Sequence, residues 1–260
     1  MSTRPEFLTG PHARAWDDPE VAALYRHRLL YPPALFDALI ELLGTARRVV
    51  LDAGAGTGAI ARNIASRVER VDAVEPSAAM IAEARRLPGG DSARIRWIRS
   101  TAEDAPLDGP YGMIVTSQSL HWMDWQVVIP RFAAALAPDG HFAIVDDPEE
   151  PEAWSEGLLD IIRRYSMVQQ AVHQFALIPE LERRGLFVRE GERRIDPLPM
   201  TQTVNEYIAS FHARSSLARN RIGPEAAAKF DAEVRALVAG RDSIVRHVGG
   251  RIVWGRPVAP

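Results

Sequence analysis

An acidic residue followed by three alternating glycines is the part of this sequence best suited to chemistry. Asp52, Gly54, Gly56 and Gly58 stand between a run of apolar residues and a helical pattern. Glycine lets the backbone turn sharply and lets a ligand approach the main chain closely. The helix that follows would present unpaired N–H groups and the positive end of its dipole. This pattern predicts a ligand-binding crevice at the carboxyl edge of a parallel sheet.

The residues around this loop fit more than one class of cofactor. A dinucleotide fingerprint of the form G-x-G-x-x-G/A can be read through Gly54, Gly56 and Ala59. Glu75 ends the next apolar run, where its carboxylate would accept hydrogen bonds from the ribose diol of either class of cofactor. A tight strand-to-helix turn without a ligand is the third interpretation, so these residues alone leave the cofactor open.

Short apolar runs alternate with helical patterns over the first 147 residues. Alternation at this spacing indicates βαβ units and a parallel sheet. Apolar residues at helical spacing also predict a pair of helices within 19–43, the second of which ends at Gly44. Strands are expected at 48–53, 71–75, 95–98, 112–116 and 141–145, and further helices at 59–68, 77–87 and 127–136.

The pattern changes after Asp147. No linker rich in Pro, Gly or Ser separates the two parts, so the second part is expected to add closing strands to the same sheet and a helical lid. Helices are expected at 151–184, 204–217 and 225–238, a strand at 187–195, and a hairpin around Gly249-Gly250 within 243–254. We predict a single domain over 1–260, with cofactor-covering helices at 1–44, a cofactor-binding core at 45–147 and a substrate side at 148–260.

Composition excludes several classes of chemistry. The 260 residues include no cysteine, which excludes disulfides, thiolate nucleophiles and Cys-type zinc sites. Lys229 is the single lysine and lies in a polar, Ala-rich run, which argues against a Schiff base. The seven histidines form no H-x-x-x-H pair, so no metal is predicted. The net charge of −3 and the lack of a long apolar stretch argue against nucleic-acid and membrane partners, and a cytoplasmic protein is expected.

Five segments, taken in order, resemble the class I S-adenosylmethionine-dependent methyltransferases. The glycine loop resembles the first motif of that family, and Glu75-Pro76-Ser77-Ala78-Ala79-Met80 resembles the second. Thr101-Ala102-Glu103-Asp104 is similar to the third-strand motif, and Leu136-Ala137-Pro138-Asp139-Gly140 to the loop before strand five. Residues 111–122 resemble the strand-four motif, in a variant that ends in Gln-x-x-His-Trp. Gly112 departs from the pattern, since the family often has an aspartate there, usually in a structural role.

The resemblance implies a Rossmann-like, doubly wound, mostly parallel sheet of seven strands, with helices on both faces, and S-adenosylmethionine as the cofactor. In the family the second-motif acid binds both ribose hydroxyls. Residues 21–32 resemble a helix that folds over the cofactor in a small-molecule subgroup, and exposed helix positions are the alternative for this segment. The residues that the resemblance places at the cofactor are Tyr25, Arg28, Asp52, Gly54, Ala55, Gly56, Glu75, Pro76, Met80, Ala102, Glu103, Ser117 and Gln118.

The implied reaction is in-line methyl transfer to an oxygen, nitrogen or carbon nucleophile of a small molecule. His121 is the candidate general base, because it follows strand four and an imidazole titrates near neutral pH. The alternative is that His121 only packs the crevice wall. Trp122, Tyr207 and Arg214 are candidate substrate-binding residues, with core packing or a solvated helix face as their alternatives.

Three rival functions stay open. An RNA, DNA or protein methyltransferase would share the fold, but Thr116-Ser117-Gln118-Ser119 replaces the Asn/Asp-Pro-Pro-Tyr/Phe segment of amino-group nucleic-acid enzymes. A dehydrogenase or non-catalytic Rossmann protein is the second rival, and a non-methylating enzyme on the same cofactor scaffold is the third. A monomer or homodimer is expected, and the preference for arginine over lysine indicates a bacterium with GC-rich codons.

Overall fold

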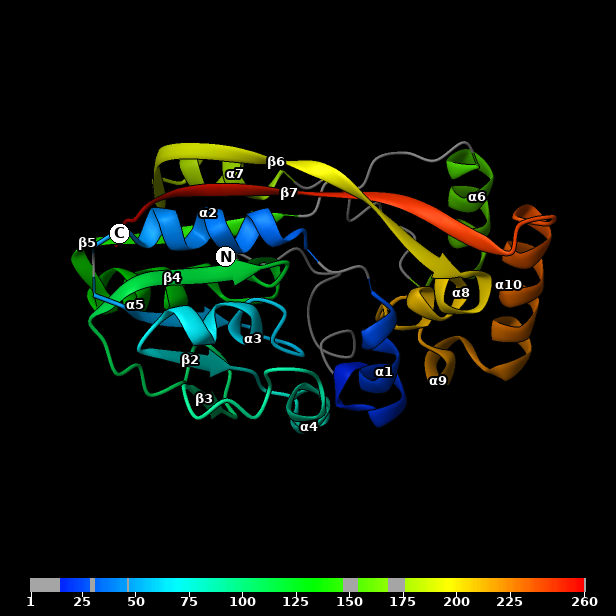
Figure 1. Ribbon diagram of the computed structural model, residues 1–260, viewed down its shortest axis with the longest axis horizontal. Coiled ribbons are helices and arrows are strands. Elements are labelled where there is room, and N and C mark those ends of the chain that lie inside the picture. Colours follow the sequence, from blue (N-terminus) through cyan, green and yellow to red (C-terminus); the bar gives the residue numbers. More distant parts are fainter. Residues whose placement is uncertain (1–14, 29–30, 46, 147–153, 168–175, 260) are drawn as a thin grey trace.

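A seven-stranded sheet forms the centre of the protein (Figure 1). The computed structural model describes residues 15–28, 31–45, 47–146, 154–167 and 176–259. The strand order is β3-β2-β1-β4-β5-β7-β6, and β7 runs antiparallel to both of its neighbours while the other pairs are parallel. The predicted mostly parallel sheet is thereby confirmed. The strands are β1 (Val49–Ala53), β2 (Arg70–Val74), β3 (Ile95–Ile98), β4 (Tyr111–Ser117), β5 (Leu136–Asp146), β6 (Phe187–Thr203) and β7 (Ser243–Pro257).

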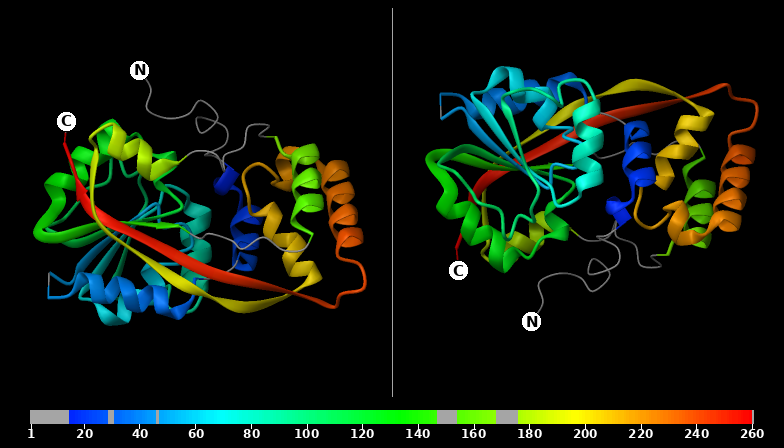
Figure 2. Two further views of the ribbon diagram at one scale, coloured as in Figure 1. Left: turned by 90° about the horizontal axis from the view of Figure 1, so that it is seen from above. Right: turned by 90° about the horizontal axis from the view of Figure 1, so that it is seen from below.

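Helices cover both faces of the sheet, as predicted (Figure 2). One apolar cluster packs α2 and α3 against one face, and a second packs α5 and α7 against the other. The helical segments are α1 (Pro19–Leu24), η3 (Tyr25–His27), α2 (Pro33–Leu43), α3 (Ala61–Ile64), η4 (Ala65–Arg67), α4 (Ala78–Arg86), η5 (Leu120–Trp122), α5 (Trp125–Ala135), α6 (Ser155–Tyr165), α7 (Leu177–Arg183), α8 (Val204–His212), α9 (Arg219–Ile222) and α10 (Pro224–Leu237). Of these described helices, none has the length and apolar character needed to cross a membrane.

Local sequence signals set the ends of several helices. In α2, Leu35, Leu39 and Leu43 recur every four residues and are fully buried, each contributing about 1.5–3 kcal/mol of hydrophobic stabilisation. Gly44 then ends the helix with a φ of +54°. At the start of α4 the hydroxyl of Ser77 accepts a hydrogen bond from the Met80 N–H at 3.1 Å, the N-cap that the sequence predicted.

A helical cap stands beside the sheet. We use this name for α6, α8, α9 and α10, which the long β6–β7 ribbon carries away from the core (Figures 1 and 2). The cap has an apolar cluster of its own, in which Tyr207, Phe211, Phe230 and Val234 are fully buried. Segment α1–η3 contacts both α4 of the core and α8 of the cap, so it lies between the two.

The C-terminal half departs most from the prediction. The expected hairpin at 243–254 is wrong, because β7 continues as one strand through Gly249-Gly250. A Cβ added at Gly250 would lie 2.4 Å from Cδ1 of Leu35, so glycine there lets α2 pack closely on the strand. Helix α8 ends at His212 instead of 217, and β5 begins already at Leu136. Of the helical stretch expected at 151–184, residues 151–153 and 168–175 lie outside the described residues.

We expect Gly112→Ala to lower the free energy of unfolding by about 1–3 kcal/mol, the usual cost of overpacking. A Cβ at this position in β4 would lie only 1.9 Å from the backbone oxygen of Arg47, which explains the departure from the family's aspartate. Urea denaturation would measure the loss. Gly157→Ala in α6 is the control, since its nearest neighbour is a methyl group of Leu237 at 3.0 Å and alanine favours the helix. An equally stable Gly112→Ala protein would contradict the prediction.

Candidate active site

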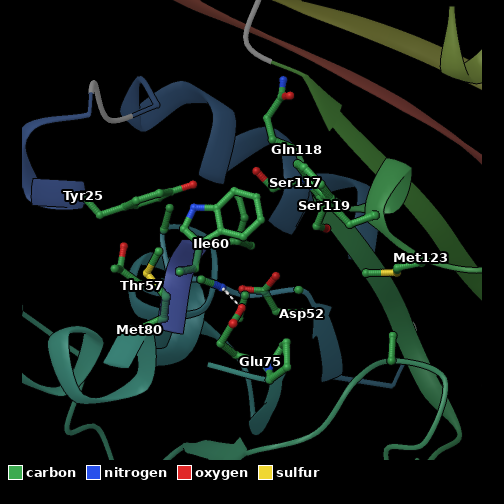
Figure 3. Close-up of a pocket in the computed structure, with 18 of the residues that line it drawn as sticks. Tyr25, Asp52, Thr57, Ile60, Glu75, Met80, Ser117, Gln118, Ser119 and Met123 are labelled. Carbon is green, nitrogen blue, oxygen red and sulfur yellow. Dashed lines mark hydrogen bonds between the residues drawn. The ribbon is translucent and has the colours of Figure 1, made fainter. Parts of the chain in front are cut away.

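A cavity of about 270 Å³ lies at the carboxyl ends of β1, β2 and β4 (Figure 3). Every residue that the sequence placed at the cofactor lines it, and so does Trp122. The structure therefore brings together residues from the N-terminal helices, the glycine loop and the segments after β2, β3 and β4. This is the crevice at the sheet edge that the glycine pattern predicted.

The glycine loop follows β1 and is fixed to the end of β2. The N–H groups of Gly54 and Ala55 both donate to the carbonyl oxygen of Val74, at 2.9 and 3.0 Å. Gly54 and Gly56 have φ angles of +72° and +57°, in the left-handed region that favours glycine. A Cβ at Gly54 would lie 2.5 Å from Cβ of Ser119, whereas a Cβ at Gly56 would meet no atom within 4 Å. Gly56 thus leaves open space beside a turned backbone, as a closely bound ligand requires.

Asp52, at the end of β1, places a buried carboxylate against the cavity. Its Oδ2 accepts a hydrogen bond from the Ala61 N–H at 3.0 Å, while its buried Oδ1 has no hydrogen-bond partner within the described parts of the chain. Burial raises the pKa of Asp52 to about 7; the Ala61 N–H opposes this rise and the charge of Glu75 adds to it. An ammonium or another donor at Oδ1 would satisfy this oxygen and stabilise its charge.

Glu75 adds a second carboxylate directly after β2. Its Oε2 accepts from the Gly56 N–H at 2.8 Å, and its Oε1 accepts from the Ser77 N–H at 2.9 Å. Burial raises the pKa of Glu75, and the hydrogen bonds from the Ser77 and Gly56 N–H groups oppose that rise. The charge of Asp17 raises the pKa further. Each carboxylate oxygen can accept a second hydrogen bond. The two carboxylates make this side of the cavity suited to hydroxyl and ammonium donors (Figure 3).

Cationic and hydroxyl groups line another side of the cavity. Arg28 donates a hydrogen bond to the Tyr25 hydroxyl at 3.3 Å, and the hydroxyls of Tyr31 and Ser117 are 2.7 Å apart. Gln118 follows β4 with a φ of +52°, a strained value for a residue other than glycine. Figure 3 shows Tyr25 and Gln118 away from Asp52 and Glu75. This side is suited to an anionic group such as a carboxylate.

Aromatic and loop residues complete the cavity wall. The rings of Trp16 and Trp122 meet edge to face with centroids 4.8 Å apart. Glu103 accepts a hydrogen bond from the Asp124 N–H at 2.8 Å, which joins the loop after β3 to the start of α5. This bond holds the Glu103 carboxylate at the cavity.

Several lining residues were not predicted from the sequence. Trp16 precedes the first helical pattern, so no periodicity marked it. Tyr31 lies within the segment that resembles a cofactor-covering helix, and that signal could have identified it. The others are Thr57, Ala59, Ile60, Thr101, Ser119 and Met123, which follow the recognised motifs or lie within them.

Three predicted residues are not in the cavity lining. His121 is partly buried beside Trp122, with ring centroids 5.2 Å apart; burial and then the charge of Arg28 lower its pKa to about 4. Tyr207 is fully buried in the cap, where its hydroxyl accepts from Trp154 Nε1 at 3.0 Å. Arg214 stacks on the ring of Phe211, 5.2 Å from its centroid. The geometry therefore does not support Tyr207 and Arg214 as substrate-binding residues.

The central part of the chain is similar to known methyltransferases. Residues 50–140 match the family described as a methyltransferase domain. An uncharacterized methyltransferase of Mycobacterium tuberculosis is 35% identical over 146 residues, which are 55% of this chain and 57% of that protein. An uncharacterized methyltransferase of Staphylococcus carnosus is 30% identical over 133 residues, covering 50% and 60% of the two chains. The chain thus matches these curated relatives over little more than half of their length.

A solved structure from Anaeromyxobacter dehalogenans, described as a candidate type II methyltransferase, has the same fold. It superposes with a TM-score of 0.65 at 24% identity, covering 88% of this chain and 97% of the other. This likeness confirms the predicted fold. Residues 50–140 are thus similar to a methyltransferase domain, and this part of the chain contains the glycine loop and the segments after β2, β3 and β4.

Asp52→Asn should stabilise the ligand-free protein at pH 8 by about 1–3 kcal/mol, because it removes a buried charge and keeps an oxygen for the Ala61 N–H. The folded-state pKa of Asp52 lies above its ordinary value of 3.8, so folding favours the protonated form. The stability of the wild-type protein therefore falls as pH rises from about 4 to 7, and the advantage of the variant shrinks toward pH 4. Urea denaturation at pH 8 and pH 5 would show this. A wild-type protein that is more stable than the variant at pH 8 would refute the conclusion that the charged Asp52 carboxylate destabilises the ligand-free fold.

Proposed function

We propose that this protein transfers the methyl group of S-adenosylmethionine to an oxygen, nitrogen or carbon nucleophile of a small molecule. The observation that carries the proposal is the Oδ1 of Asp52, which is buried beside Glu75 and the glycine loop in the cavity and has no hydrogen-bond partner among the residues that the structure describes. Together with the methyltransferase match of residues 50–140, this cavity fits a nucleoside that carries an amino acid. The proposal also assigns residues 1–44 to covering the cofactor, 45–147 to binding it and 148–260 to the substrate side.

Each side of the cavity has a role in holding the cofactor. Glu75 would accept the two ribose hydroxyls, and Asp52 Oδ1 would accept the ammonium. Arg28 and Tyr25 would hold the carboxylate of the methionine part. Pro76 and Met80 would contact the face of the adenine, and Ala102 and Glu103 would contact its edge. Ser117 and Gln118, at the end of β4, would lie beside the methionine part.

When bound, the cofactor supplies an activated methyl group on a sulfonium. The contribution of this chain is then chiefly positioning, for which effective molarity can account for roughly 7–11 kcal/mol of a barrier. Trp16, Trp122 and Tyr25 line the cavity, where they would restrict the access of water to the bound cofactor. The cap and α1 stand beside the carboxyl edge of the sheet (Figure 2), an arrangement that favours a small acceptor near Trp122 over a macromolecule.

His121 is proposed as the general base for acceptors that must lose a proton. Its lowered pKa keeps the imidazole neutral above about pH 5 and also makes it a weaker base than an ordinary histidine, so this role suits acceptors that lose a proton readily. Its position next to Trp122, behind the cavity lining, requires the acceptor to approach from the Trp122 side.

Calorimetric titration with S-adenosylmethionine, S-adenosylhomocysteine, NADH and NADPH would test the proposal, with micromolar binding expected for the two sulfur nucleotides only. Glu75→Ala should weaken that binding by about 1–3 kcal/mol, the range for a lost hydrogen bond to a charged group. Glu69→Ala is the matched control, because Glu69 is exposed before β2 and does not line the cavity. Unchanged affinity in a folded Glu75→Ala protein would remove Glu75 from the site, and binding of a nicotinamide nucleotide alone would overturn the proposal.

If His121 is the base, His121→Ala should reduce turnover at least a hundredfold while cofactor affinity is preserved. The wild-type rate should be flat from pH 8 down to about pH 5.5, because the neutral ring predominates over that whole range. Single-turnover rates across pH, with an acceptor found by screening, would measure both effects. A smaller loss than a hundredfold in His121→Ala would contradict the role of base and leave His121 a packing residue beside Trp122.

A further inference from the structure

The segment Ala15–Arg28, which we call the cover segment, links the cofactor cavity to the cap. Its residues Trp16, Tyr25 and Arg28 line the cavity. Its helical parts are short: a 3-10 turn over residues 15–17, the six-residue α1 and the three-residue η3. Helices this short are not stable alone in water, so contacts with the rest of the protein must hold the segment in place.

Contacts with the core hold one side of the cover segment. The Ser77 hydroxyl donates to the carbonyl oxygen of Trp16 at 2.6 Å. Arg26 forms an ion pair of 2.8 Å with Glu83 of α4, whose side chain is only 3% exposed. These bonds tie the segment to the helix that follows Glu75, and they explain why the predicted cofactor-covering residues reach the cavity.

The cap holds the other side at the end closest to Arg28. Gln202, near the end of β6, donates from Nε2 to the carbonyl oxygen of His27 at 2.6 Å. Gln202 is itself buried, and Thr203 after it forms a capping box with Glu206 at the start of α8. Gln202 therefore lies directly before a capped helix start, and its amide nitrogen holds the peptide immediately before Arg28.

A second cap residue holds the start of α1. Asn220 of α9 donates from Nδ2 to Oδ2 of Asp18, whose other oxygen caps α1 by accepting from the Glu20 N–H at 2.7 Å. Arg219 lies 3.6 Å from Glu20 and also pairs with Asp231 inside the cap. The cap thus contacts both ends of the helical part of the cover segment.

We propose that Gln202 and Asn220 are positioning residues, through which the cap holds Trp16, Tyr25 and Arg28 over the cofactor and so sets cofactor affinity. This inference rests on the proposed function, because it takes the cavity to be the cofactor site. Neither residue lines the cavity, and each acts through one hydrogen bond to the cover segment. A segment ordered before binding does not have to be ordered by the ligand, so its affinity for the ligand is higher.

The test measures the dissociation constant of S-adenosylhomocysteine by tryptophan fluorescence in the full-length protein. Gln202→Ala and Asn220→Ala should each raise it roughly three- to tenfold, which corresponds to one hydrogen bond. The double variant should show the product of the two effects. Asn205→Ala is the matched control, since Asn205 accepts from Arg235 at 2.9 Å within the cap and should leave the dissociation constant unchanged.

Hydrogen exchange of the ligand-free protein separates positioning from a loss of stability. Gln202→Ala should speed exchange of the amides in 19–28 and leave those of α10 unchanged, whereas a general loss of cap stability would speed both. Equal affinity of the wild type and both variants, or an equal loss in Asn205→Ala, would overturn this inference alone. A wild-type protein that does not bind S-adenosylhomocysteine would overturn the proposed function with it.

Discussion

The burial of two carboxylates at the ends of neighbouring strands is the constraint on which the rest of the site depends. Asp52 and Glu75 both have raised pKa values because they lie out of water, and each raises the energy of the folded protein when it is charged. The N–H groups of Ala61, Gly56 and Ser77 offset only part of that cost. The glycine loop must therefore adopt positive φ angles to aim an N–H at Glu75 and still leave space for a ligand.

The sheet around these carboxylates supplies the stability that they remove. Val50 and Leu51 of β1 are fully buried on opposite faces, each in a different apolar cluster. A strand packed on both faces cannot shift its register without exposing one set of side chains. Asp52 is therefore held at the sheet edge even while Oδ1 lacks a partner among the described residues, and the free energy of ligand binding can include the relief of that unpaired group.

The sequence was sufficient to predict the parts whose signals are local. The first five strands, the glycine loop and the Ser77 cap each depend on neighbouring residues, and so the predicted cofactor residues converge on one cavity. The structure of β7 and of the cap depends instead on contacts between residues far apart in the sequence. Gly249-Gly250 reads as a turn, yet both glycines lie within one strand: a Cβ at Gly250 would meet Leu35 of α2 at 2.4 Å, and a Cβ at Gly249 would meet the carbonyl oxygen of Ile195 in β6 at 2.9 Å. From the sequence, Tyr207 could line a pocket or pack in a core. The pairing of β6 with β7 carries α8 into the cap, where Tyr207 packs in the apolar cluster.

The methyltransferase match begins after the cover segment and ends in β5, before the chain continues into the cap. Residues 50–140 contain the loops that we propose hold the ribose and adenine of the cofactor, parts that do not change with the acceptor. The cover segment and the cap lie outside that range, and they are the parts that meet across His27 and Gln202. Segments far apart in the sequence thus meet where the methionine part of the cofactor would lie next to the acceptor. A change in the cap that suits a new acceptor therefore also acts on Arg28, so acceptor choice and cofactor affinity are expected to change together in this architecture.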